Sequence, residues 1–198
     1  MKKAIILAGI KHCGKSTQGR LLSERLNCQF YDTDDIITQI TGSTPREIYS
    51  VKGEESFKQA EEEACKYLAK QLVKSDSKTV SAVIATGGGI CNNPNALEYL
   101  RPLSTIFFLE TPKSVATERI IREITYANDG SMKSLPAYIV KENPQTEADV
   151  RRIFGDFFDK RVKLYRKLAD VVCVLEDAPC YINAKKIWQR VQQFLDIE

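Results

Sequence analysis

The segment Gly9–Thr17 has glycines, a lysine and hydroxyl groups at the spacing of a phosphate-binding loop. Its sequence, GIKHCGKST, fits the pattern G-x-x-x-x-G-K-[ST], and it follows the apolar run 4–8. The glycines allow a tight turn in which backbone N–H groups point at phosphate oxygens, and the start of the following helix adds partial positive charge. The sequence therefore predicts that the chain binds a nucleoside triphosphate.

The residue types within this loop predict individual roles. Lys15 would reach the β- and γ-phosphates as a point charge, and Ser16 would place its hydroxyl on Mg²⁺. Cys13 is a candidate reactive thiol beside Lys15, but we favour the alternative, a loop residue whose side chain points away from the phosphates. The residues predicted to bind the nucleotide phosphates are Gly9, Lys11, His12, Cys13, Gly14, Lys15, Ser16 and Thr17.

Three carboxylates follow the second predicted strand, in the segment YDTDD at 31–35. A phosphoryl-transfer enzyme needs carboxylates that hold Mg²⁺ and a group that receives the proton of the attacking hydroxyl. In an extended segment, Asp32 and Asp34 point the same way, so both can face one cleft. We expect Asp35 to be the N-cap of the next helix, because aspartate is favoured at that position.

Three consecutive glycines, Gly87, Gly88 and Gly89, follow the third predicted strand. Such a run costs conformational entropy on folding, so it needs a structural reason. Two reasons remain open at this stage: a very tight turn, or a ligand that lies against the bare backbone.

Alternating apolar runs and amphipathic segments predict the fold. Predicted strands cover residues 3–8, 29–32, 80–85, 105–109 and 171–175, and predicted helices cover 15–26, 35–40, 54–73, 94–100, 112–124, 148–168 and 182–195, with a further short helix beginning at Pro45. Five strands separated by helices predict an α/β fold with a five-stranded parallel sheet covered on both faces. Ligands bind at the carboxyl ends of such strands, where the phosphate loop, the acidic segment and the glycine run would meet.

Residues 125–147 differ from the rest of the chain. They contain Asn, Asp, Gly, Ser and two Pro, and we find no periodic apolar face among them. We therefore predict a long functional loop or lid that is not part of the core. Since no linker divides the chain, residues 1–198 are predicted to form one domain.

Composition excludes several other classes of protein. The net charge is only +3, from 29 basic and 26 acidic residues that are interspersed, which argues against binding to nucleic acid or to a membrane surface. No apolar stretch approaches the ~18 residues that span a bilayer. Six cysteines without a C-x-x-C pair, beside a single histidine, give no zinc pattern. Scattered thiols of this kind are typical of a reducing compartment, so we expect a cytoplasmic protein.

Over nearly its whole length, the sequence resembles the shikimate kinases, a branch of the nucleoside-monophosphate-kinase-like P-loop kinases. The resemblance implies a three-layer α/β/α fold with a mobile lid, and ATP and Mg²⁺ as its reaction partners. We expect the chain to be a monomer. In chain order, the matching segments are the phosphate loop 9–17, FYDTD at 30–34, TG at 41–42, GEESF at 53–57 with Glu61, ATGGG at 85–89, FLE at 108–110, and Lys160-Arg161, Leu164-Tyr165 and Ala169-Asp170.

Carried over by position, the resemblance implies roles for residues outside the phosphate loop. Asp34 would contact the hydroxyls of the acceptor and act as the base, and Asp32 would hold Mg²⁺ through water. Arg161 would bind the carboxylate of the acceptor, and Arg119 would lie against adenine. The glycines 87–89 would line the acceptor site, where Gly88 and Gly89 offer backbone N–H groups.

The chain departs from the family pattern at two places. Lys58 stands where the family has a second carboxylate-binding arginine, and lysine lacks the bidentate fork of arginine. The lid segment 135–138 reads LPAY where the family has Arg-Pro-Leu-Leu, so the lid arginine is missing. Lys133, Arg122 and Lys141 are candidate substitutes for it, and the sequence does not choose among them.

The expected function is an ATP-dependent small-molecule kinase that converts ATP and shikimate to ADP and 3-phosphoshikimate. The first alternative is a kinase of another hydroxy acid or sugar, such as gluconate, on the same fold. The second is a nucleotide-binding regulatory module that transfers no phosphate, which only the missing lid arginine supports.

Overall fold

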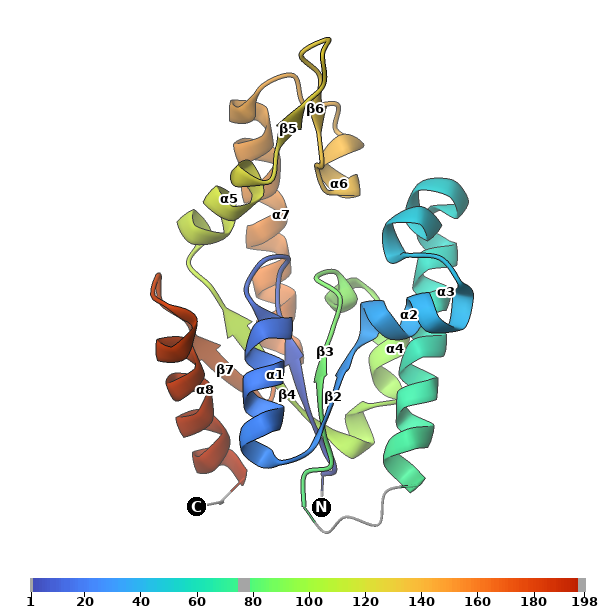
Figure 1. Ribbon diagram of the computed structural model, residues 1–198, viewed down its shortest axis with the longest axis vertical. Helices are drawn as coiled ribbons and strands as arrows, with labels where there is room; N and C mark the ends of the chain where they lie inside the picture. The colour runs from blue at the N-terminus through green and yellow to red at the C-terminus, as the bar shows by residue number, and fades with distance from the viewer. Residues whose placement is uncertain (1, 75–78, 196–198) are drawn as a thin grey trace.

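Five parallel strands form the central sheet in the computed structural model, which describes residues 2–74 and 79–195 (Figure 1). The strands are β1 (Ala4–Ala8), β2 (Gln29–Asp32), β3 (Ala82–Ala85), β4 (Ser104–Glu110) and β7 (Val171–Val174). Their order is β2-β3-β1-β4-β7, and Ile6 in the centre is in register with Ile84 and Ile106. The predicted five-stranded parallel sheet is confirmed.

Helices cover both faces of this sheet. They are α1 (Lys15–Leu26), α2 (Thr33–Thr41), α3 (Pro45–Lys74), α4 (Pro94–Glu98), α5 (Lys113–Arg122), α6 (Ala137–Val140), α7 (Glu147–Leu168) and α8 (Cys180–Leu195). Right-handed crossovers place α1 and α8 on one face, where they pack together, and α3, α4 and α7 on the other (Figure 1). Within the described part of the chain, none of the helices has the length and apolar character needed to cross a membrane.

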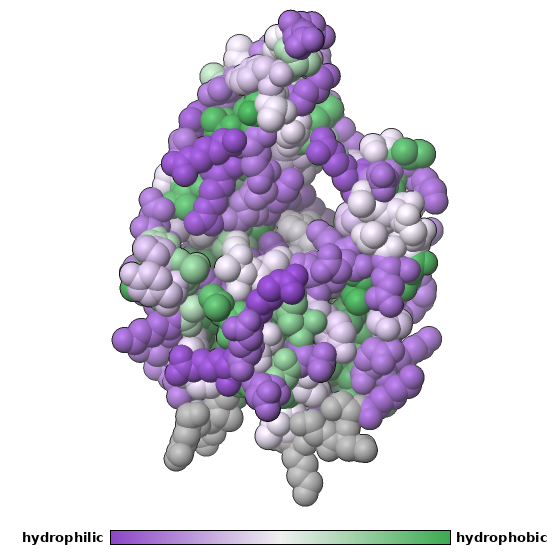
Figure 2. All heavy atoms as spheres, in the orientation of Figure 1, coloured by the Kyte–Doolittle hydropathy of each residue, from purple (hydrophilic) through white to green (hydrophobic). Residues whose placement is uncertain are grey.

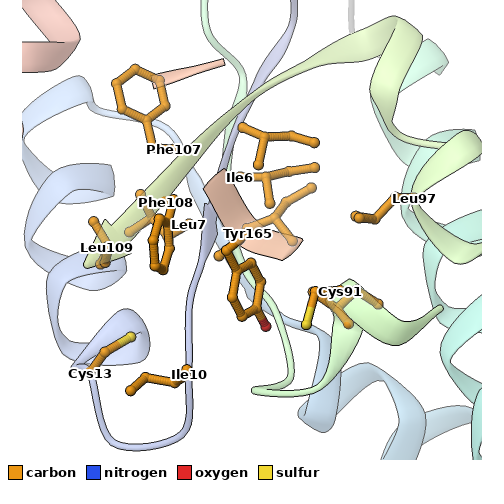
Figure 3. Close-up of a cluster of buried hydrophobic side chains, with 14 of the residues drawn as sticks. Ile6, Leu7, Ile10, Cys13, Cys91, Leu97, Phe107, Phe108, Leu109 and Tyr165 are labelled. Carbon is orange, nitrogen blue, oxygen red and sulfur yellow. The ribbon is translucent and has the colours of Figure 1, made fainter. Parts of the chain in front are cut away.

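The core explains why the central strands are apolar along their whole length. All five residues of β1 are buried, since helices cover the sheet on both sides. Figure 3 shows Phe108 beside Tyr165, whose rings stack with centroids 5.1 Å apart. The same cluster includes Ile10 and Cys13 from the phosphate loop (Figure 3), and each is only 2% exposed. Cys13 therefore anchors the loop to the core.

Two helix starts differ from the prediction. The second helix begins at Thr33, not near Asp35, because the Asp32 carboxylate accepts a hydrogen bond from the backbone N–H of Asp34 at 3.0 Å and is the N-cap. Asp35 lies in the first turn instead, and the prediction that it caps the helix was wrong. The long helix predicted from residue 54 is the second part of α3, which begins at Pro45 and is broken at Gly53, with φ 85° and ψ 178°.

The lid also has more structure than predicted. Strands β5 (Thr125–Tyr126) and β6 (Met132–Lys133) form an antiparallel hairpin, and α6 follows it. Leu135 and Ile139 are buried, 4% and 0% exposed, and α6 packs on α3 and α7. The prediction that this segment is not part of the core was wrong, because its apolar face spans a single helical turn, too short to produce a period.

Candidate active site

The phosphate loop turns between β1 and α1 at the upper end of the sheet (Figure 1). Gly14 has a φ of 91°, and a Cβ atom on Gly9 would lie 2.7 Å from Cys13 Sγ and 2.9 Å from the carbonyl oxygen of Leu109. A side chain at either glycine would therefore strain or displace the loop. His12 also has a positive φ of 64°, a conformation that is uncommon for residues other than glycine.

Lys15 is folded back onto its own loop. Its Nζ donates to the carbonyl oxygen of Ile10 at 2.9 Å and lies 3.7 Å from Cys13 Sγ. The residue is 8% exposed, and no carboxylate of the described residues is paired with it. A buried ammonium held by one carbonyl is available to an anion such as a phosphate.

Ser16 and Asp32 offer oxygen ligands of the kind that Mg²⁺ prefers. The Ser16 hydroxyl donates to Asp32 Oδ2 at 2.6 Å. The described residues contain no group of three acidic, histidine or cysteine side chains that could hold a metal by themselves. This donor set fits Mg²⁺ rather than a protein-caged metal, because Mg²⁺ usually keeps water and phosphate oxygens among its ligands.

A cavity of about 420 Å³ lies beside the phosphate loop. Its lining includes five residues that were predicted to bind the acceptor: Asp34, Lys58, Gly88, Gly89 and Arg161. It also includes Lys11, which was predicted to bind phosphate. The space-filling view shows a hollow between the lid and the upper end of α3, with mostly hydrophilic residues at its rim (Figure 2). The structure thus brings residues that follow the second and third strands together with a residue of α7.

Asp34 lies in the first turn of α2 and lines this cavity. Asp34 is exposed to the solvent of the cavity, but protein groups crowd its carboxyl and partly displace water from it. This partial desolvation, together with the nearby charge of Asp32, raises the pKa of the carboxyl to about 6. A carboxyl with this pKa is ionised at neutral pH. Because its pKa lies close to neutral pH, it can also accept a proton during the reaction.

The glycine run is needed for close packing against protein atoms. A Cβ on Gly88 would lie 2.7 Å from the backbone nitrogen of Lys11, and a Cβ on Gly87 would lie 3.1 Å from Asp34 Oδ1 and 3.2 Å from Glu61 Oε1. The backbone N–H of Gly87 donates to Thr33 Oγ1 at 2.9 Å. Contact between the glycine run and the phosphate loop is a third reason for the glycines, which the sequence alone did not suggest.

Replacing Gly88 by alanine is expected to lower Tm and to weaken nucleotide binding. The added methyl group meets backbone atoms of Lys11, which can yield only if the phosphate loop moves. Overpacking of this kind costs about 1–3 kcal/mol, which lowers Tm by roughly 2–4 °C per kcal/mol in a chain of this size. Thermal unfolding and ATP titration would measure both effects.

Gly89→Ala is the control for stability, since its Cβ would lie 3.6 Å from Arg161 Nη2, an ordinary contact. An unchanged Tm for Gly88→Ala would contradict the prediction.

Arg161 is held in the cavity with hydrogen-bond donors to spare. Its Nη1 donates to the carbonyl oxygen of Gly88 at 3.3 Å, and its guanidinium lies 4.5 Å from the ring centre of Tyr138 and 5.5 Å from that of Phe157. Its Nε is buried and has no hydrogen-bond partner among the described residues. A planar cation fixed by two rings, with free donors, suits a carboxylate ligand.

Lys58 has carboxylate partners of its own. Its Nζ lies 3.4 Å from Glu54 Oε1 and 3.1 Å from Glu55 Oε1. Because it is 30% exposed, these ion pairs are worth little and can be exchanged for a ligand. Lys58 is therefore present at the cavity as a point charge, not as the second fork that an arginine would supply.

Glu61 is a buried acid at the cavity to which the sequence analysis gave no role. It is 2% exposed, its Oε2 accepts a hydrogen bond from Asn93 Nδ2 at 3.2 Å, and its Oε1 has no hydrogen-bond partner within the described residues. Burial is the main cause that raises its pKa to about 7. The sequence could have indicated this burial, since Glu61 is a charged residue on the apolar face of α3, beside Ala60 and Ala64.

The pKa of Glu61 predicts how stability depends on pH. Its folded pKa of about 7 lies above the ordinary value of 4.5, so the folded state loses stability as pH rises from about 4.5 through 7. Glu61→Gln carries no such charge, so we expect its Tm to exceed the wild-type Tm at pH 8 and the difference to shrink by pH 5. Thermal unfolding across this range tests the prediction, with Glu62→Gln as the control for replacing a glutamate of α3 by glutamine. A Tm difference for Glu61→Gln that grows toward low pH would contradict it.

Arg119 of α5 contacts His12 of the phosphate loop, and neither residue lines the cavity. Arg119 Nη1 donates to the carbonyl oxygen of His12 at 2.6 Å, and His12 Nε2 is 3.1 Å from Glu123 Oε2. Burial lowers the pKa of His12 to about 4, so its ring is neutral at pH 7. Thr17 is exposed in the first turn of α1. The assignment of these three residues to the nucleotide stays a prediction.

Comparisons with known proteins agree with this geometry. The family model "Shikimate kinase" matches residues 11–195. A shikimate kinase of Tolumonas auensis is 30% identical over 196 residues, which are 99% of this chain and 98% of that protein. A solved shikimate kinase of Acinetobacter baumannii, in complex with shikimate, has a TM-score of 0.74 at 26% identity and covers 99% of this chain and 94% of that one. A sugar kinase from Janibacter sp., 14% identical with a TM-score of 0.60, shares the fold alone.

Proposed function

Because this chain belongs to the shikimate kinase family, we propose that it transfers the γ-phosphoryl group of ATP to a hydroxyl of shikimate, giving ADP and 3-phosphoshikimate. It is a phosphotransferase with an alcohol group as acceptor. The observation that carries the proposal is the cavity, in which Asp34 and Arg161 share one lining with Lys11 of the phosphate loop. A hydroxylated, carboxylated acceptor needs a base, a cation and a nearby phosphate site.

Asp34 receives the proton in the proposed reaction. The acceptor hydroxyl gives its proton to the Asp34 carboxylate as its oxygen forms a bond to the γ-phosphorus. The bond between that phosphorus and the oxygen bridging it to the β-phosphate breaks, and ADP leaves with the electron pair. Lys15 stabilises the charge that develops on the transferring group, and catalysis is mainly positioning and charge neutralisation.

Ser16 and Asp32 would hold Mg²⁺, Ser16 through its hydroxyl and Asp32 through water. When bound, Mg²⁺ supplies neutralisation of the phosphate charge. Arg161 binds the carboxylate of the acceptor with Lys58 beside it, and Arg119 lies toward adenine. The lid, residues 125–147, excludes water so that ATP is not hydrolysed.

We also propose that the chain acts as a monomer in the cytoplasm. Every residue with a role in the proposed reaction belongs to this chain, so the proposed reaction calls on no second subunit. All six cysteines lie within the described residues and each is a free thiol, which suits a reducing compartment.

The test is ADP release by the purified protein with Mg-ATP, measured with and without shikimate. A shikimate-dependent rate with a KM in the range of ~1 μM to 1 mM supports the proposal. Gluconate is the second acceptor to measure, because Lys58 pairs with Glu54 and Glu55 and lacks the arginine fork. A rate with gluconate alone would move the function to that acceptor. ATP binding without any acceptor-dependent ADP release would favour a regulatory module.

A further inference from the structure

The lid helix α6 forms one wall of the acceptor cavity. Tyr138 and Lys141 are three residues apart, so they lie on the same side of the helix, and both line the cavity. The Tyr138 ring lies under the Arg161 guanidinium, and Lys141 Nζ lies 4.6 Å from the ring centre of Tyr49 on α3. The lid thus brings an aromatic ring and an ammonium group to the acceptor site.

Glu54 connects this wall to α3. Its Oε1 lies 3.4 Å from Lys58 Nζ and its Oε2 lies 3.4 Å from Lys141 Nζ. The Tyr49 hydroxyl also donates to Oε2, at 3.3 Å. Two ammonium groups therefore share the Glu54 carboxylate, and Lys58 has Glu55 as a second partner at 3.1 Å, whereas Glu54 is the one carboxylate paired with Lys141 among the described residues.

The Lys141–Glu54 contact is easily exchanged. Lys141 is 55% exposed and Glu54 is 48% exposed, and an ion pair between groups this exposed contributes little to stability. A ligand carboxylate that Arg161 already holds could replace Glu54 at little cost. Lys58 cannot form the bidentate contact with a carboxylate that an arginine would form. The ammonium of Lys141 would offset this loss as a second positive charge at the acceptor carboxylate.

We infer that Lys141 is a specificity-determining residue for the acceptor: its ammonium exchanges Glu54 for the acceptor carboxylate, which Arg161 and Lys58 also bind. This inference rests on the proposed function and adds a named lid residue to it. It assigns Lys141, among the three candidates that the sequence left open, to the acceptor carboxylate and not to the transferring phosphate.

Lys141→Met tests the inference when shikimate is compared with its methyl ester. With shikimate, we expect KM to rise about tenfold, because the variant loses a charge-assisted hydrogen bond to the bound carboxylate, and such bonds are stronger than those between neutral groups. With the ester, which has no carboxylate charge, KM should change less than about twofold, as should KM for ATP. Lys141→Arg keeps the positive charge, so its KM for shikimate should stay close to the wild-type value. Lys163→Met, on the exposed side of α7, is the matched control and should match wild type.

Glu54→Gln separates acceptor binding from simple closure of the lid. If Lys141 binds the acceptor, removing its competitor leaves KM for shikimate equal or lower. If the Lys141–Glu54 pair only closes the lid, Glu54→Gln and Lys141→Met should raise KM by the same factor. The increase should then be equal for shikimate and for its methyl ester, and this result would overturn the inference. An unchanged KM for shikimate in Lys141→Met also overturns it.

Failure of the proposed function would give a different result: the wild-type protein would release no ADP with shikimate. The same comparison then applies to gluconate and gluconamide, a pair that differs in the same charge. Wild-type turnover of uncharged sugars alone would overturn both proposals.

Discussion

Asp34→Asn is expected to lower kcat by about 10²- to 10⁴-fold while ATP binds with nearly its wild-type affinity. Asparagine has almost the shape of aspartate but cannot accept the proton of the acceptor hydroxyl, and a positioned base contributes about this much to a rate. Asp34 lines the acceptor cavity on α2, outside the phosphate loop itself, so the nucleotide contacts should remain.

ADP release gives kcat, and calorimetric titration gives the affinity for ATP. The matched control is Asp35→Asn, because Asp35 is an exposed neighbour in the same helical turn and does not line the cavity. We expect kcat within about twofold of wild type for this control, as is usual for a surface change. Unchanged turnover in Asp34→Asn would remove Asp34 from the reaction.

Lys15→Met is expected to abolish most turnover and to stabilise the nucleotide-free protein. Lys15 is 8% exposed, and its ammonium donates to the carbonyl oxygen of Ile10 without a paired carboxylate among the described residues. Burying such a charge costs free energy that a methionine of similar length does not incur. Removing one charge-stabilising group from a transition state typically costs about 10²–10³ in kcat.

Thermal unfolding and ADP release test this trade-off together. A gain of about 1 kcal/mol would raise Tm by roughly 2–4 °C in a chain of this size. ATP should raise the Tm of the wild type, because it binds only the folded state, and should raise that of Lys15→Met much less. Lys163→Met should change neither Tm nor kcat. A lower Tm for the nucleotide-free variant would show that the loop needs the lysine for its own structure.

The order of secondary structure and the phosphate loop could be predicted from the sequence alone. Each of these features depends on residues that are neighbours in the chain: the apolar runs of strands covered on both faces, and the fixed spacing of Gly14, Lys15 and Ser16. The meeting of the phosphate loop, Asp34 and the glycine run at one end of the sheet also followed, because parallel strands present their carboxyl ends at one edge.

Tertiary structure decided the features that depend on contacts between distant segments. The reason for Gly88 is the backbone of Lys11, 77 positions away in a chain of 198 residues, and the raised pKa of Glu61 arises from burial. Asp32 became the helix cap because its carboxylate reaches the N–H of Asp34 once the strand ends there. Lys141 lies at the acceptor cavity because the buried side chains of Leu135 and Ile139 hold α6 against the rest of the protein. Local spacing fixes which groups are available, whereas the packing of the whole chain fixes which of them meet and how far water is excluded from them.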